Sequence, residues 1–113
     1  SKAEIVLEKV AKVLNDHTEL DLLVEGHTDN VPMVNSDSII DNWDLSAKRA
    51  TSVVRILQNK FGIAPQRMTA GGRSEYVPKA TNDTEEGKQK NRRTEIIVTP
   101  KLDQLLQLLN NQK

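Results

Sequence analysis

The chain has no cysteine and very few aromatic residues. Without cysteine it cannot form a disulfide, a thiolate metal site or a cysteine nucleophile, which is compatible with the cytoplasm and with an oxidising compartment. Phe, Trp and Tyr make up 3% of the residues, so platforms on which bases or flat cofactors stack are not expected. The 16 basic and 16 acidic side chains cancel, which argues against nucleic acid as a partner.

Long apolar runs are also absent. No stretch of about 18 apolar residues and no signal peptide occurs, so any membrane attachment is expected from segments outside this sequence. With 113 residues, 36% of them hydrophobic, the chain is predicted to form a single domain over residues 1–113 with an aliphatic core. Residues 101–113 are expected to be a helical extension of that domain.

Helices and strands are predicted from the spacing of the apolar residues. Apolar positions three and four apart predict helices over residues 3–14, 43–61 and 102–110, and one further helical turn is expected around residues 84–91. Alternating or short apolar runs between turn signals predict strands over residues 20–26, 67–72 and 94–100. The first two strands, joined through a helix, are expected to be parallel. Asn42 or Asp44 is the expected N-cap of the second helix.

The last predicted helix carries a stripe of leucines, namely Leu102, Leu105, Leu106 and Leu109. The stripe either packs on the domain or forms the seam of a homodimer. Both interpretations stay open on the sequence alone.

Asp29 and Arg49 are the clearest candidate ligand-binding pair. Asp29 follows the first predicted strand, where α/β sheets commonly place ligand sites, and Arg49 lies two turns into the next helix. A carboxylate and a planar guanidinium could hold the ammonium and the carboxylate of one small zwitterion. Short polar groups beside this pair would come from Thr28, Asn30 and Asn42. The alternative is a structural salt bridge between loop and helix.

Two further patterns have simpler explanations. His27 near Asp29 could indicate a metal-dependent hydrolase, but no HExxH or GxSxG pattern occurs, and a hydrogen-bonded structural His27 is favoured. The run KQKNRR over residues 88–93 is interrupted by uncharged residues, which favours a solvated loop over a nucleic-acid patch. Arg92 or Arg93 of this run could point toward the candidate ligand site at Asp29 and Arg49.

The motifs GHTD, NWDLSAKRA and NRR, in this order, resemble the OmpA-like C-terminal domain family over about residues 20–99, and most closely its MotB-like branch. The resemblance implies an α/β fold, a two-layer sandwich of helices on a small mixed β-sheet. It implies a non-enzymatic domain that binds peptidoglycan noncovalently, without cofactor or metal. The implied location is the periplasm, within an envelope protein anchored in the outer or the inner membrane.

The resemblance also assigns roles to matching residues. Asp29 and Arg49 would hold the diaminopimelate unit of the stem peptide, and Asn42 would hydrogen-bond the peptide. The resemblance also places Thr28, Leu45, Ser46 and Arg93 at or near the peptide-binding groove. The complete predicted site consists of Asp29, Arg49, Asn42, Thr28, Asn30, Leu45, Ser46 and Arg93. A dimerisation or stator-contact module, with wall binding secondary, is the alternative function.

Overall fold

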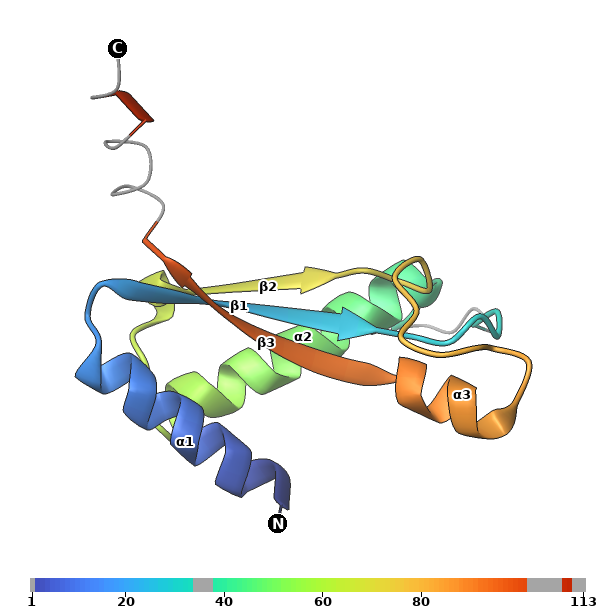
Figure 1. Ribbon diagram of the computed structural model, residues 1–113, viewed down its shortest axis with the longest axis horizontal. Coiled ribbons are helices and arrows are strands. Elements are labelled where there is room, and N and C mark those ends of the chain that lie inside the picture. Colours follow the sequence, from blue (N-terminus) through green and yellow to red (C-terminus); the bar gives the residue numbers. More distant parts are fainter. Residues whose placement is uncertain (1, 34–37, 102–108, 111–113) are drawn as a thin grey trace.

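The computed structural model describes residues 2–33, 38–101 and 109–110. Within them, three strands form one sheet in the order β2-β1-β3, made of β1 (Leu20–His27), β2 (Met68–Gly72) and β3 (Arg93–Pro100) (Figure 1). β1 pairs parallel with β2 and antiparallel with β3. The predicted mixed sheet and the parallel orientation of its first two strands are therefore confirmed.

Within residues 2–33 and 38–101 the helices are α1 (Lys2–Asp16), α2 (Asn42–Asn59) and α3 (Glu85–Asn91), and a 3-10 turn η1 (Pro65–Arg67) precedes β2. The predicted positions of these three α-helices are confirmed. α1 and α2 lie together on one side of the sheet, which gives the expected two layers (Figure 1). The predicted helix 102–110 and its leucine stripe lie outside the described residues except for Leu109 and Asn110, so the homodimer seam stays a prediction.

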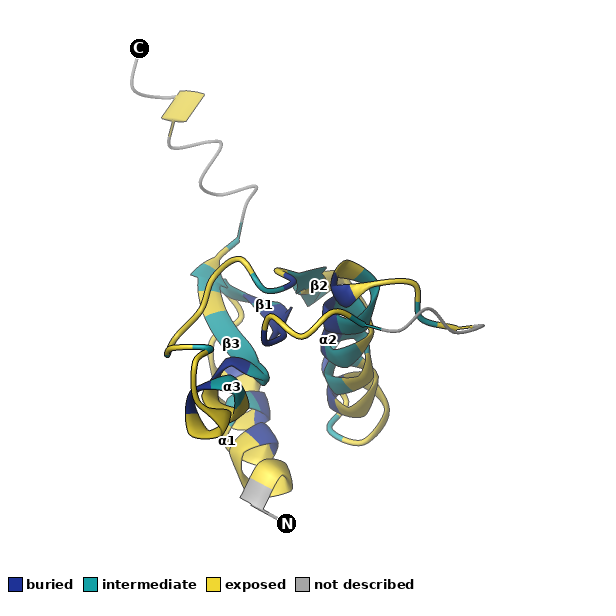
Figure 2. Cartoon of the chain, turned by 90° about the vertical axis from the view of Figure 1, so that its right-hand side faces the viewer, coloured by how far each residue is buried: buried dark blue, intermediate teal, exposed yellow. Residues whose placement is uncertain are grey.

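The core lies between the helix layer and the sheet and is aliphatic, as the composition predicted. β1 is the most buried strand, because it has a neighbour on each edge and both helices beneath it (Figure 2). The buried hydrophobic residues are Leu7, Ala11, Leu14, Leu22, Val24, Ala50, Leu57 and Ile63. Alternation along β1 places Leu22 and Val24 on the helix side, so Glu25 and His27 lie on the other face.

Gly26 and Gly72 are register partners on β1 and β2, and both let α2 lie directly against the sheet. A Cβ atom on Gly26 would lie 1.9 Å from the carbonyl oxygen of Ser46, and one on Gly72 would lie 2.7 Å from the backbone nitrogen of Ala47. Only glycine fits where two backbones approach this closely. This contact fixes the first turns of α2 beside the carboxyl end of β1.

α2 is capped by Asp41, so the prediction of Asn42 or Asp44 as its N-cap is wrong. The Asp41 carboxylate accepts a hydrogen bond from the backbone N–H of Asp44 at 2.9 Å. Asn42 is already helical, and its side-chain amide donates to the carbonyl of Val31 at 3.0 Å. The Asp44 carboxylate accepts from the backbone N–H of Ile40, which ties the incoming loop to the first turn.

Replacing Asp41 with alanine should lower the free energy of unfolding by about 1 kcal/mol, because one N–H at the start of α2 loses its acceptor. Asp41→Asn is the matched control, since its amide oxygen still accepts this bond. Urea denaturation followed by circular dichroism measures both. Equal destabilisation by the two variants would contradict the capping role.

Among the described residues, no helix combines the length and the apolar character needed to cross a bilayer.

Candidate ligand-binding site

A pocket of about 250 Å³ lies between the loop that follows β1 and the first turns of α2. The residues that line it are Thr28, Asp29, Val31, Pro32, Met33, Asn42, Leu45, Arg49 and Arg92. The fold thus gathers Asp29, Arg49, Asn42, Thr28 and Leu45 around one space. A larger hollow of about 630 Å³ runs along α1, but none of the predicted site residues lines it.

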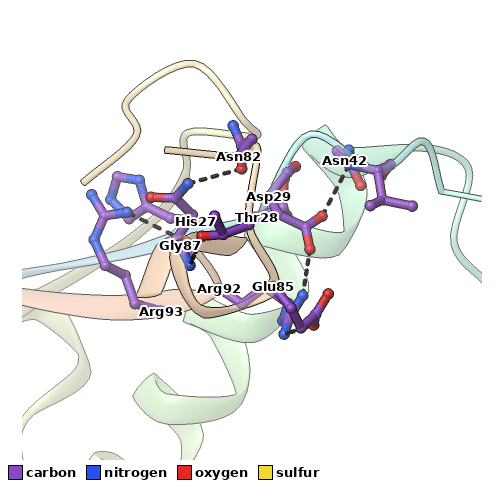
Figure 3. A network of polar contacts seen from close by, with 12 residues as sticks. His27, Thr28, Asp29, Asn42, Asn82, Glu85, Gly87, Arg92 and Arg93 are labelled. Carbon is purple, nitrogen blue, oxygen red and sulfur yellow. Dashed lines mark hydrogen bonds and ion pairs between the residues drawn. The ribbon is translucent and has the colours of Figure 1, made fainter. Parts of the chain in front are cut away.

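Asp29 and Arg49 share this pocket without pairing with each other. The Asp29 carboxylate is buried, accepts the backbone N–H of Val31 at 3.0 Å and forms an ion pair with Arg92 (Figure 3). Arg49 donates from Nη1 to the carbonyl oxygen of His27 at 3.2 Å, and within residues 2–33 and 38–101 it forms no ion pair. The alternative of a direct Asp29–Arg49 salt bridge is therefore not what the structure shows.

Arg92, rather than Arg93, completes the pocket. Arg92 is the C-cap of α3 and bridges Asp29 and Glu85. The hydrogen bonds that Arg92 donates, first to Asp29 and then to Glu85, raise the pKa of its guanidinium above the usual value. Arg93 does not line the pocket; its Nε donates to Glu95 at 3.1 Å and its Nη2 to the carbonyl of Val77 at 2.9 Å.

Two other predicted site residues lie outside the pocket lining. Asn30 is exposed. Ser46 is fully buried, and its hydroxyl donates to the carbonyl of Trp43 at 2.9 Å while accepting from the backbone N–H of Ser74 at 3.0 Å. Ser46 therefore ties α2 to the chain that leaves β2.

Among the described residues that line the pocket, the charged ones are one acid and two bases, Asp29, Arg49 and Arg92. Their formal sum is +1, so the pocket favours a carboxylate, with Asp29 available to a neighbouring ammonium. Arg49 uses one of its guanidinium donors on the His27 carbonyl. The remaining N–H groups of this planar fork can bind both oxygens of a carboxylate.

The imidazole of His27 is not hydrogen-bonded to any described residue, contrary to the sequence-based interpretation. Its side chain is 1% exposed, yet neither ring nitrogen has a hydrogen-bond partner among residues 2–33, 38–101 and 109–110. Burial first, and the nearby Arg93 charge second, lower the pKa of the imidazole. The ring lies beside Glu25 and Glu95, and these carboxylates rather than Asp29 form the acidic group around it.

Comparison with known proteins identifies the family. The sequence pattern of the OmpA family matches residues 1–92. The chain belongs to the OmpA family. This OmpA-family chain is 35% identical over 101 residues to motility protein B of Bacillus subtilis, a match that covers 88% of the chain and 38% of that protein. The chain therefore spans about two fifths of this relative.

Solved structures support the same assignment. The C-terminal domain of Helicobacter pylori MotB has a TM-score of 0.79 and 25% identity, with 100% of this chain and 88% of that chain covered. A longer piece, described as the periplasmic domain of that protein, gives 0.72 and 26%, with 95% and 69% covered. The cell wall anchor of the T6SS from Pseudomonas aeruginosa gives 0.71 and 37%, with 88% and 67% covered. The OmpA-like fold predicted from the motifs is confirmed.

Proposed function

We propose that this OmpA-family domain binds peptidoglycan noncovalently and so anchors an envelope protein to the cell wall. The supporting observation is the pocket at the end of β1, in which Arg49 presents a guanidinium without an ion-pair partner among the described residues, beside the buried carboxylate of Asp29. The same fold is found in a protein described as a cell wall anchor. The domain acts by binding alone, without catalysis.

The proposed ligand is the diaminopimelate unit of the stem peptide, whose free end carries an ammonium and a carboxylate. Arg49 binds the carboxylate through two parallel hydrogen bonds, and the positive charge of Arg92 supports it. Asp29 accepts the ammonium with the lone pairs that Val31 and Arg92 leave unused. Asn42 fixes the pocket wall by holding the carbonyl of Val31.

The site of action that we propose is the periplasm. The Helicobacter pylori relative was crystallised as a periplasmic domain, and peptidoglycan lies in the same compartment. Any segment that attaches the protein to a membrane would lie outside this sequence, which spans 38% of the Bacillus subtilis relative.

Arg49→Gln should weaken binding of a diaminopimelate-containing muropeptide at least about 10-fold, because a hydrogen-bonded charge contributes about 1.5–3 kcal/mol. Isothermal titration calorimetry measures the affinity. Asp29→Asn should weaken it similarly, and a thermal melt checks that the loss of the Arg92 ion pair leaves the domain folded.

Arg55→Gln is the matched control, since Arg55 is an exposed arginine on the same helix α2 and does not line the pocket. It should bind like the unmodified chain. Unchanged affinity in both Arg49→Gln and Asp29→Asn would refute the proposed binding mode.

A further inference from the structure

A second polar cluster lies on the sheet face opposite the helices, separate from the pocket. Glu25 and Glu95 are directly paired across β1 and β3, and His27 is paired with Arg93 two residues further along. Because alternate residues of a strand share a face, these side chains meet on one side of the sheet. One ligand atom each from Glu25, His27 and Glu95 lie within 4.8 Å of one another.

His27 is the unexplained member of this cluster. Its side chain is 1% exposed, and both ring nitrogens lack a hydrogen-bond partner in the part of the chain that the structure describes. Buried polar atoms nearly always have a partner. Its Nε2 lies 3.6 Å from Oε1 of Glu25 and 3.6 Å from Oε2 of Glu95, so it faces both carboxylates at distances too long for hydrogen bonds.

Two arginines orient the carboxylates. Arg73 Nε donates to Oε2 of Glu25 at 3.0 Å, and Arg93 Nε donates to Oε1 of Glu95 at 3.1 Å. The oxygens that face His27 are therefore the ones that these arginines do not use. Partners of this kind hold the ligands of metal sites in position.

The separations fit the spacing of ligands around a small metal ion. Zinc binds histidine nitrogen and carboxylate oxygen at about 2.0–2.2 Å, and tetrahedral ligands are then about 3.4 Å apart. The two nitrogen–oxygen distances of 3.6 Å approach this value, so side-chain shifts of a few tenths of an ångström would complete the geometry.

We propose that Glu25, His27 and Glu95 bind one Zn²⁺ ion. The two carboxylates offset its charge, Nε2 of His27 supplies the nitrogen ligand, and water takes the fourth position. Glu95, whose side chain is 40% exposed, gives the ion a path from solvent. Burial lowers the pKa of His27, which is the direction that favours the neutral imidazole needed for binding. This site departs from the sequence-based expectation of no metal.

Calorimetric titration of the chelator-treated chain with ZnCl₂ tests the proposal. The unmodified chain should bind one Zn²⁺ per chain. Loss of an outer partner of a metal ligand costs about 10–100-fold in affinity, so His27→Gln, which removes a ligand, should cost on the order of 100-fold or more. Glu95→Gln, at a half-exposed position, should weaken binding in a variant that retains its fold by circular dichroism.

His17→Gln is the matched control, because it removes the other histidine, which is exposed and lies outside the cluster. It should leave Zn²⁺ binding unchanged. No Zn²⁺ binding by the unmodified chain, or equal loss in His17→Gln and His27→Gln, would overturn the proposal. The titration contains no muropeptide, so its result is independent of the proposed wall binding.

Discussion

Gly26→Ala should destabilise the domain by more than about 4 kcal/mol, enough to leave little of it folded. The new methyl group would lie 1.9 Å from the carbonyl oxygen and 2.8 Å from the carbonyl carbon of Ser46, and 3.3 Å from the backbone nitrogen of Ala50. These are helix backbone atoms, so no rotation of a side chain relieves the overlap. α2 would have to move away from the sheet, which opens the core beneath it.

Gly71→Ala is the matched control for this prediction. Gly71 lies on the neighbouring strand β2, where an added Cβ meets nothing within 4 Å. Its free energy of unfolding should stay within about 0.5 kcal/mol of the unmodified chain or rise slightly, because alanine has less conformational freedom when unfolded. Urea denaturation followed by circular dichroism compares the variants. Coincident unfolding transitions for Gly26→Ala and Gly71→Ala would contradict the prediction, because they would show that α2 can move away from the sheet without loss of stability.

Asn91→Ala should cost about 3–5 kcal/mol of stability. Asn91 is fully buried, and its oxygen accepts the backbone N–H groups of Lys79 and Ala80 while its nitrogen donates to the carbonyl of Ala80 and to Oδ1 of Asn82. Alanine would remove all of these bonds and leave the part-buried backbone groups of Lys79 and Ala80 without this partner. Because Arg92 is the next residue, muropeptide affinity should fall as well.

Asn59→Ala provides the comparison, since Asn59 is an exposed residue at the end of α2. It should change stability by less than about 0.5 kcal/mol. Asn91→Asp keeps the acceptor for the two N–H groups but turns a carboxylate oxygen toward the carbonyl of Ala80 and Oδ1 of Asn82, so it should also destabilise the domain. Guanidinium denaturation measures all three. A change as small in Asn91→Ala as in Asn59→Ala would contradict the anchoring role.

The helices and strands could be predicted because their signals are local. The apolar spacing of α1 and α2 and the short apolar runs of β1 and β3 are visible in any window of the sequence. The N-cap of α2 could not be predicted, because Asp41, Asn42 and Asp44 are all good capping residues within four positions. Only the side-chain geometry shows that Asn42 reaches Val31 and leaves the cap to Asp41.

The candidate site was predictable in its centre and not at its edge. Asp29 and Arg49 flank the connection from β1 to α2, so their proximity follows from the strand–helix order. The choice between Arg92 and Arg93 depends on the residue at which β3 begins, since one step along the chain changes the direction of the side chain. The structure starts β3 at Arg93 and leaves Arg92 to reach Asp29.

The cluster around His27 could not be predicted from the sequence for a related reason. Glu25 and Glu95 meet only because β1 and β3 pair in one particular register. Neither apolar spacing nor motif order specifies that register. A shift by one residue would have turned Glu95 to the opposite face.

The order β2-β1-β3 also sets the timing of folding, because the first strand to leave the ribosome is the middle one and both of its neighbours are made later. The chain must be complete to Pro100 before β1 is paired along both edges. Until then the backbone amides and carbonyls of β1 are open to other extended chains.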